Sequence, residues 1–272
     1  MSRTADPCTY LAEVRAIAAE AGTRILEVYQ RPFSVSAKED GSPLTEADRA
    51  AHRLIVSELS ALTPDIPLLS EESAAIDYGV RAKWTRFWLV DPLDGTKEFI
   101  KRNDEFTVNI ALVDSGRPVL GVVLAPVLDV SYWACAGQPA FKRTADGHVG
   151  QIHARRYAGG KATVAVSRSH PGARLAGFLQ SLARREGEPQ TMAMGSAVKM
   201  CLVAEGVADA YPRFGPTSEW DTAAAQCVLE AAGGRLTDFE MRPLTYNKRS
   251  VLNPWFLASG IGDYAWTEHL HA

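Results

Sequence analysis

Hydrophobic positions in the first quarter of the chain recur with the spacing of a helix. Between residues 8 and 30 the apolar positions lie three or four apart, at Leu11, Val14, Ala18, Ala21, Ile25 and Val28. This spacing places them on one helical face, so the pattern predicts an amphipathic helix that ends before Pro32. The same pattern predicts a second helix from about Thr45 to Leu62, after a turn-rich connection.

The next part of the chain changes from helical spacing to short apolar runs. Residues 87–90 form an unbroken Phe-Trp-Leu-Val run between charged neighbours, which is typical of a buried strand. Three further runs, rich in valine and aromatic residues, begin at Thr107, Val119 and Val130 and are separated by turn residues. They predict an antiparallel meander.

Strands and helices alternate in the second half of the chain. The predicted strands cover 162–167, 209–214 and 235–239, and the predicted helices cover 172–186, 196–205 and 221–232. This alternation argues for an α/β half that packs against an α+β half. A polar, turn-rich stretch with paired glycines lies between about residues 140 and 160. We therefore expect two domains, over residues 1–150 and 151–272.

Composition narrows the class of protein. The chain has 272 residues, 46% hydrophobic and 22% charged, as expected for an ordinary globular protein of one compact unit or two small domains. A net charge of −3 predicts no surface for a nucleic acid polymer. No apolar run approaches a membrane span, and the first ten residues lack the apolar core of a signal peptide. We expect a cytoplasmic protein and leave open a peripheral contact with the inner membrane.

The four cysteines carry a separate expectation. Cys8, Cys135, Cys201 and Cys227 are far apart and form no C-x-x-C pair. The spacing therefore predicts reduced thiols rather than a zinc site or a disulfide framework.

Candidate chemistry begins directly after the first predicted strand, where the sequence reads DPLDGT. Asp91 and Asp94 lie three apart, and Gly95 and Thr96 follow them. Carboxylates and backbone carbonyls suit hard divalent cations, and the backbone N–H groups at a helix start suit phosphate. Alone, a D-x-x-D-G sequence is most often a solvated surface turn. The complete string behind a buried strand favours a metal and phosphate site.

Three other acidic positions have a structural and a chemical interpretation. Asp48 follows Thr45 at the start of the second predicted helix, as in a capping box. Asp221 also begins a predicted helix, where an acid is ordinarily a cap or a partner of the helix dipole. Glu71 and Glu72 end a short apolar strand predicted over 66–73. Adjacent acids repel unless a cation lies nearby, and the simpler alternative is a solvated pair.

Two of these segments resemble the signatures of the inositol monophosphatase superfamily of metal-dependent, lithium-sensitive phosphatases. DPLDGT behind an apolar strand is similar to the first signature, and WDTAA…EAAGG, which contains Asp221, is similar to the second. The segment LTEAD, which ends at Asp48, is similar to a third conserved segment of the superfamily, and the match extends to Gly234. The resemblance implies the layered αβαβα sugar-phosphatase fold, in which α+β and α/β parts are combined.

The resemblance also implies a role for each acid. Two or three Mg²⁺ ions would be bound by Glu71, Asp91, Asp94, Asp221 and the Leu93 carbonyl. Two ions can clamp a phosphate, generate hydroxide from bound water and neutralise the leaving oxygen. Thr96 would hold the attacking water, with Asp48 accepting the threonine proton. The Gly95 and Thr96 N–H groups would receive phosphate oxygens, without a covalent intermediate, and Li⁺ would inhibit.

The second half carries the substrate prediction. The segments SRSH at 167–170, GSAVKMCLVAEG from Gly195 and YPRFGPTSEWD from Tyr211 resemble the bacterial 3′(2′),5′-bisphosphate nucleotidases. These enzymes convert 3′-phosphoadenosine 5′-phosphate, a by-product of sulfate assimilation, to AMP. The resemblance implies that the nucleotide is contacted by Ser167, His170, Gly195 and Lys199. A second phosphate needs further cations, which Lys199 and Arg213 could supply. The simpler alternatives are a solvated lysine and a structural histidine.

Three functions are kept as hypotheses. The first is hydrolysis of the 3′-phosphate of this small-molecule phosphonucleotide, with its 5′-phosphosulfate as an additional substrate. The second is an inositol or other sugar monophosphatase, which the segments of the second half argue against. The third is a phosphonucleotide-binding regulator without catalysis, which the complete set of acids argues against. The oligomeric state is left open.

Overall fold

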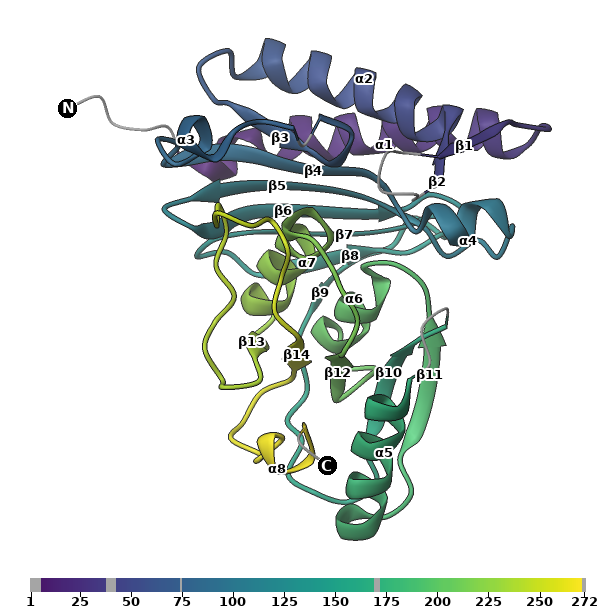
Figure 1. Cartoon of the computed structure of the whole chain (residues 1–272), viewed down its shortest axis with the longest axis vertical. Helices are drawn as coiled ribbons and strands as arrows, with labels where there is room; N and C mark the ends of the chain where they lie inside the picture. The colour runs from purple at the N-terminus through teal and green to yellow at the C-terminus, as the bar shows by residue number, and fades with distance from the viewer. Residues whose placement is uncertain (1–5, 38–42, 74, 169–171, 271–272) are drawn as a thin grey trace.

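The computed structural model describes residues 6–37, 43–73, 75–168 and 172–270, and Figure 1 shows their arrangement. The helices are α1 (Leu11–Tyr29), α2 (Glu46–Leu62), α3 (Tyr78–Arg81), α4 (Thr96–Ile100), α5 (Ala173–Glu186), α6 (Val198–Ala204), α7 (Glu219–Ala231) and α8 (Thr267–Leu270), with 3₁₀ turns η1 (Pro7–Tyr10) and η2 (Glu71–Ser73). Within the described residues, none of these helices is long and apolar enough to cross a membrane.

Two large sheets form the framework. The first has the order β3-β4-β5-β6-β7-β8-β9, with strands Leu68–Ser70, Arg86–Asp94, Thr107–Asp114, Arg117–Ala125, Val130–Cys135, Ala140–Arg143 and Val149–Ile152. The second has the order β11-β10-β12-β14-β13, with strands Gln190–Met194, Thr163–Ser167, Ala210–Arg213, Phe256–Ser259 and Arg235–Asp238. A small hairpin joins β1 (Val35–Ala37) to β2 (Pro43–Thr45).

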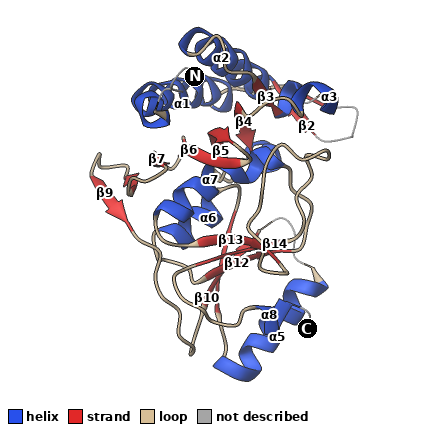
Figure 2. Ribbon diagram, turned by 90° about the vertical axis from the view of Figure 1, so that its left-hand side faces the viewer, coloured by secondary structure: helices blue, strands red, loops and turns tan. Residues whose placement is uncertain are grey.

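The elements stack in five layers, as the side view in Figure 2 shows. Helices α1 and α2 cover one face of the seven-stranded sheet, and α6 and α7 fill the space between the two sheets. Helices α5 and α8 cover the far face of the five-stranded sheet. The predicted αβαβα fold is therefore confirmed. The predicted division at residue 150 stays a prediction, because one hydrophobic cluster contains residues of both sheets together with α6 and α7.

Strand β4 shows why the first sheet is buried on both faces. Trp88 and Val90 pack under α1 and α2, whereas Phe87 and Leu89 pack toward α6 and α7. Successive side chains of a strand point to opposite faces, so an unbroken apolar run is what a sheet covered on both sides requires. The predicted meander is also confirmed, since β4 to β7 pair antiparallel in chain order.

The polar stretch at 140–150 was expected to be a connection, and this expectation was wrong. It forms the antiparallel pair β8 and β9 at the edge of the seven-stranded sheet. Edge strands need few apolar residues because one side faces solvent, so their sequence lacks the signal that marks β4.

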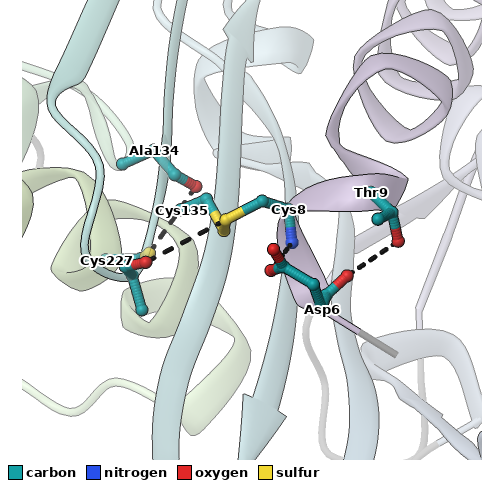
Figure 3. The surroundings of a disulfide bond; sticks show 7 residues. Asp6, Cys8, Thr9, Ala134, Cys135 and Cys227 are labelled. Atoms are coloured by element: carbon teal, nitrogen blue, oxygen red, sulfur yellow. Dashed lines mark hydrogen bonds between the residues drawn. A yellow bond between two sulfur atoms is a disulfide. The ribbon is translucent and has the colours of Figure 1, made fainter. Parts of the chain in front are cut away.

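The expectation that all four cysteines are reduced is also wrong. Cys8 and Cys135 form a disulfide with their Cα atoms 5.5 Å apart (Figure 3). The bond joins η1 to the end of β7, two elements 127 residues apart in sequence, so their proximity arises only from the tertiary fold. Cys201 and Cys227 are free and buried, and the Cys227 thiol donates to the Ala134 carbonyl beside the disulfide.

Candidate active site

The DPLDGT turn is shaped by an irregularity in strand pairing. Asp91 pairs with Asn109 and Asp94 with Thr107, and the register shifts between them. Such a bulge redirects side chains, here so that both carboxylates leave the same end of β4. The Leu93 N–H donates to one oxygen of Asp91 at 3.0 Å. A hydrogen bond between two of its own residues therefore stabilises the turn.

Gly95 ends this turn with a backbone conformation that other residues rarely adopt. Its φ is 97°, and an added Cβ would lie 3.2 Å from the Glu105 carbonyl oxygen. Positive φ and close backbone approach both require glycine. Helix α4 begins immediately afterwards at Thr96. Gly95 thus allows the sharp turn between β4 and α4.

Three carboxylates meet at this point. Asp91, Asp94 and Asp221 each offer an oxygen, and these oxygens lie within 4.8 Å of one another. Burial, followed by the neighbouring carboxylates, raises the pKa of Asp91 well above its usual range. Burial and Asp94 raise the pKa of Asp221 to about 8. Burial raises that of Asp94 to about 6, and Lys199 opposes this shift. A buried cluster of like charges is stable when cations compensate it, so the donor set fits hard metal ions.

Glu71 belongs to the same cluster. It follows β3, which pairs parallel with β4, so both strands present their carboxyl ends at one edge of the sheet. Its charge raises the pKa of both Asp91 and Asp94. The structure therefore brings Asp91, Asp94 and Asp221 together and places Glu71 next to them, and Glu72 follows Glu71 in η2.

Asp48 connects helix α2 to this turn. It completes the predicted capping box, because one of its oxygens accepts from the Thr45 N–H at 2.7 Å and from the Thr45 hydroxyl at 2.5 Å. Its other oxygen accepts from the Thr96 hydroxyl at 3.1 Å. The Leu93 carbonyl lies 3.4 Å from the same hydroxyl oxygen. Capping and contact with Thr96 therefore occur together.

Asp221 is held in the same way at the start of α7. One of its oxygens accepts from the Ser218 N–H at 2.8 Å in a second capping box. Asp221 also contributes a carboxylate oxygen to the acid cluster. The predicted cap is therefore present without excluding metal binding.

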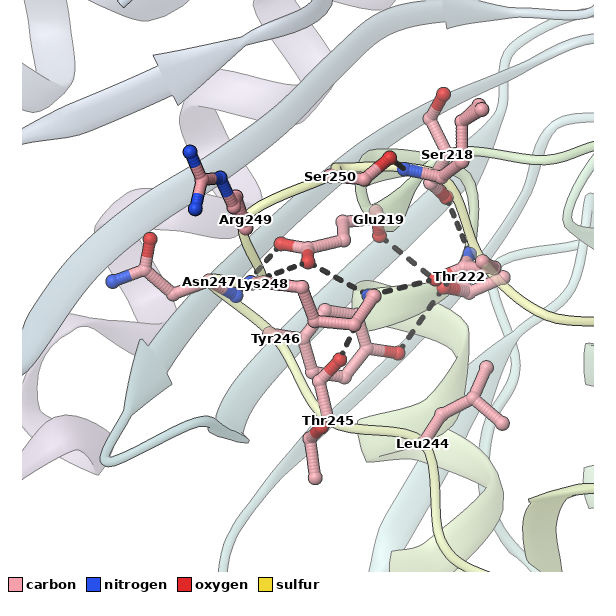
Figure 4. A network of polar contacts seen from close by, with 12 residues as sticks. Ser218, Glu219, Thr222, Leu244, Thr245, Tyr246, Asn247, Lys248, Arg249 and Ser250 are labelled. Carbon is pink, nitrogen blue, oxygen red and sulfur yellow. Dashed lines mark hydrogen bonds and ion pairs between the residues drawn. The ribbon is translucent and has the colours of Figure 1, made fainter. Parts of the chain in front are cut away.

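A buried carboxylate fixes the first turn of α7, as Figure 4 shows. Glu219 has no exposed surface and accepts from the N–H groups of Asn247 and Lys248 at 2.7 and 2.9 Å. The Lys248 ammonium adds a third contact at 2.7 Å. Asn253 also donates to the Ser218 carbonyl at 2.7 Å. The loop that contains Asn247, Lys248 and Asn253 therefore fixes the start of α7, where Asp221 lies.

A cavity of about 90 Å³ opens beside the acids. Its lining comes from both halves of the chain: Asp94, Gly95, Glu98, Ser167, Ser196, Ala197, Lys199, Met200, Tyr211, Arg213, Thr217, Asp221, Thr222 and Phe256. A second cavity of about 200 Å³ shares Ser167 and Arg213 with it and extends along Gly172 and Phe214. The two cavities together offer more room than one phosphate needs.

Two cations line the same cavity as the acids. Lys199 is only 4% exposed, and its ammonium donates to the Ser196 carbonyl at 2.7 Å. Burial lowers its pKa to about 8, and Asp94 opposes this shift. Arg213 donates to the Pro216 carbonyl at 3.2 Å, and its Nε is buried without a hydrogen-bond partner among the described residues. Cations with unused capacity suit an anionic ligand.

The residues predicted to contact the nucleotide differ in their position relative to the cavities. Ser167 lines both cavities. Gly195 does not line the first cavity, and its N–H donates instead to Glu105 at 2.8 Å. His170 lies outside the described residues. Sequence reasoning missed Glu98 in the lining and the pairing of Glu105 with Arg168, since nothing in the sequence connects segments more than 60 residues apart.

Comparison with known proteins agrees with this geometry. The model of the inositol monophosphatase family matches residues 7–269. The 3′(2′),5′-bisphosphate nucleotidase CysQ of Escherichia coli (strain K12) is 52% identical over 252 residues, which cover 92% of this chain and 99% of that protein.

Solved structures give the same result. The crystal structure of CysQ from Bacteroides thetaiotaomicron, a bacterial member of the inositol monophosphatase family, is 40% identical, with a TM-score of 0.80 over 94% of this chain and 98% of that one. A Thermotoga maritima IMPase is 26% identical, with a TM-score of 0.78 over 97% of each chain.

The layered fold and its buried acid cluster define the class of metal-dependent phosphatases. Within that class, the chain belongs to the inositol monophosphatase family. The bisphosphate nucleotidases named CysQ are the relatives to which it is most extensively similar among those described above.

Proposed function

We propose that this chain is a Mg²⁺-dependent 3′(2′),5′-bisphosphate nucleotidase that removes the 3′-phosphate of 3′-phosphoadenosine 5′-phosphate to give AMP. One observation carries the proposal: the acids Asp94 and Asp221 and the cations Lys199 and Arg213 line the same cavity. A substrate with two phosphates has a use for both kinds of group. The name of the Escherichia coli relative at 52% identity supports the same activity. We place the reaction in the cytoplasm, where this nucleotide arises.

The carboxylates of Glu71, Asp91, Asp94 and Asp221, with the Leu93 carbonyl, are the groups that would hold two or three Mg²⁺ ions. When bound, the ions would polarise the phosphate, activate water and stabilise the leaving oxygen. The capping box at Ser218 orients Asp221 within this set, because the Ser218 N–H fixes one carboxylate oxygen and so restricts the side chain.

The proposed proton path uses two side chains. The Thr96 hydroxyl donates to Asp48, so its oxygen lone pairs are free to accept a hydrogen bond from the attacking water. As the water loses a proton to the Thr96 oxygen, the threonine proton would pass to Asp48. Asp48 is held by Thr45 and cannot rotate away. The Gly95 and Thr96 N–H groups would receive oxygens of the reacting phosphate.

The rest of the nucleotide is assigned to the second half of the chain. We assign the 5′-phosphate to the wall that carries Lys199 and Arg213, and the adenosine to the adjoining cavity beyond Ser167. His170 and Gly195 stay predicted contacts. The 5′-phosphosulfate of the same nucleotide would fit the same charges.

The test is phosphate release with Mg²⁺ from 3′-phosphoadenosine 5′-phosphate and from inositol 1-phosphate at equal low concentration. We expect a large preference for the nucleotide. A preference for the inositol ester would reject the substrate and retain the metal site. If both were inert while Mg²⁺ still bound, the chain would be a binding protein.

A variant separates the metal site from the fold. Asp94→Asn removes one charge from the cluster, and we expect turnover to be lost with an unchanged circular dichroism spectrum. Asp114→Asn is the matched control, because Asp114 pairs with Arg86 at the opposite end of the β4–β5 pair. Full turnover in Asp94→Asn would contradict the assignment of the metal ligands.

A further inference from the structure

Glu105 uses both carboxylate oxygens to bind the second half of the chain. It precedes β5 and is 9% exposed. One oxygen accepts from the Arg168 guanidinium at 2.6 Å. The other accepts from Arg168 Nε at 2.9 Å and from the Gly195 N–H at 2.8 Å. This is a two-point Arg–carboxylate pair, the geometry in which such pairs are strongest.

The pair sits where two parallel strands end. Arg168 directly follows β10 and Gly195 directly follows β11, and these strands are neighbours in the five-stranded sheet. Arg168 also donates to the Ala193 carbonyl at 3.0 Å. Ser167 and Ser196, the neighbours of these two residues, both line the cavity. Glu105 therefore fixes two cavity-lining segments at once.

Gly195 is pressed directly against the segment that carries Glu105. An added Cβ would collide with the Glu105 carbonyl oxygen and with the side chain of Glu98. The backbone at residue 195 can therefore approach this closely only as glycine.

The turn that follows is strained and needs external support. Ser196 has a φ of 47°, in the left-handed region that a residue with a side chain rarely adopts. Ser196 lines the cavity, and its hydroxyl is buried without a hydrogen-bond partner among the described residues. The Ser196 carbonyl in turn accepts from the Lys199 ammonium. The positions of the Ser196 hydroxyl and of the buried cation thus depend on this turn.

We propose that Glu105 and Arg168 are positioning residues that set the specificity of the site for a bisphosphate nucleotide, by holding the 195–199 segment at the distance a second phosphate requires. This inference rests on the proposed function. Neither residue lines the cavity, so neither acts by touching substrate. Of the residues assigned to the metals and the proton path, only Asp221 lies in the second half, and its segment is held by the Ser218 cap and by the contacts of Glu219 with Asn247 and Lys248 rather than by this pair. Hydrolysis of a small phosphate ester therefore does not need the pair.

The test uses Glu105→Gln. Both oxygens of Glu105 accept hydrogen bonds, so the amide NH₂ of glutamine must face a donor in either orientation. We expect KM for 3′-phosphoadenosine 5′-phosphate to rise about 10- to 100-fold, with kcat within about twofold of wild type. The Kd of AMP, measured calorimetrically with Mg²⁺ present, should rise by a similar factor, whereas the midpoint of Mg²⁺ binding should not change.

Three comparisons keep the inference falsifiable. Arg168→Gln should raise KM as Glu105→Gln does. Arg168→Lys keeps the positive charge but not the two-point guanidinium contact, so its KM should lie between those of Arg168→Gln and wild type. Asp114→Asn loses a comparable pair with Arg86 far from the cavity and should leave KM unchanged. Inositol 1-phosphate turnover, where measurable, should stay within about twofold in all four variants.

The outcomes separate this inference from the proposed function. If wild-type protein neither hydrolyses the nucleotide nor binds AMP, the proposed function fails. If wild-type protein does both and Glu105→Gln matches it, the positioning role is wrong. An equal loss of kcat on both substrates would also overturn it, because the pair would then support the whole fold rather than the nucleotide wall.

Discussion

Binding of Mg²⁺ to the metal-free protein should release protons, because carboxylates must be ionised to bind a metal. At pH 7 a carboxyl group with the pKa of about 8 given for Asp221 is about 90% protonated, and one with the pKa of about 6 given for Asp94 is about 10% protonated. Asp91, whose pKa is raised well above its usual range, adds to this sum. We therefore expect at least about one proton released per protein at pH 7.

The assay is isothermal titration of metal-free protein with Mg²⁺ in PIPES, HEPES and Tris. These buffers differ in ionisation enthalpy, so the slope of observed enthalpy against ionisation enthalpy counts the protons. The count should decrease as the pH is raised above 8, where Asp221 is ionised before the metal arrives. It should also decrease in Asp221→Asn and stay constant in Asp129→Asn, since Asp129 lies on the surface and pairs with Arg143.

A slope of zero at pH 7 would refute the reasoning. It would mean that the carboxylates are already ionised without metal, which their mutual proximity and burial do not permit. Weak binding with a normal slope would instead retain the cluster and change only its affinity.

Three further predictions concern the cluster, the proton path and the disulfide. Asp94 and Asp221 have raised pKa values in the folded chain, so their contribution to stability is complete below about pH 4 and is lost as the pH rises through about 6 and 8. Urea unfolding with EDTA should therefore show a lower free energy of unfolding at pH 8 than at pH 5, and added Mg²⁺ should restore it; the opposite slope would contradict the raised pKa values. Thr96→Val removes the hydroxyl that contacts Asp48 and should lower kcat about 100-fold or more, with Thr96→Ser as the control that retains activity. Near-normal kcat in the valine variant would exclude this hydroxyl from the reaction. Cys8→Ser should lower the free energy of unfolding by about 2–4 kcal/mol and abolish the effect of reductant on Tm, with kcat unchanged because neither Cys8 nor Cys135 lines the cavity. An equal effect of reductant on wild type and variant would show that the disulfide does not form.

The elements that the sequence predicted are those whose own residues carry the signal. The buried face of α1 contains Val14, Ala18, Ala21, Ile25 and Val28, all members of the predicted periodic set. Gly121 is a glycine inside a predicted strand, and an added Cβ there would collide with the backbone of α7. Hydrophobic periodicity and an isolated glycine in a strand both indicate buried positions. They can therefore be interpreted without knowing which segment packs against them.

The features that were missed depend on contacts between distant segments. The β8–β9 pair has a polar sequence because it lies at a sheet edge. The Cys8–Cys135 bond needs η1 to lie beside β7, and the Glu105–Arg168 pair needs two halves of the chain to meet. The local sequence pattern carries no information about contacts between segments that are distant in the chain. The acids of the predicted metal site could be named from the sequence only because their segments resemble a known signature.

The acids at the two helix starts show why local and chemical interpretations were not alternatives. Asp48 and Asp221 each give one oxygen to a capping box, and each directs the other oxygen toward the site. A carboxylate has enough acceptor capacity for both. The cap removes rotational freedom that an unrestrained side chain would lose on binding metal or substrate. A capping signal at a helix start therefore does not lower the expectation of a functional acid there. The cap supplies the rigidity that such an acid requires.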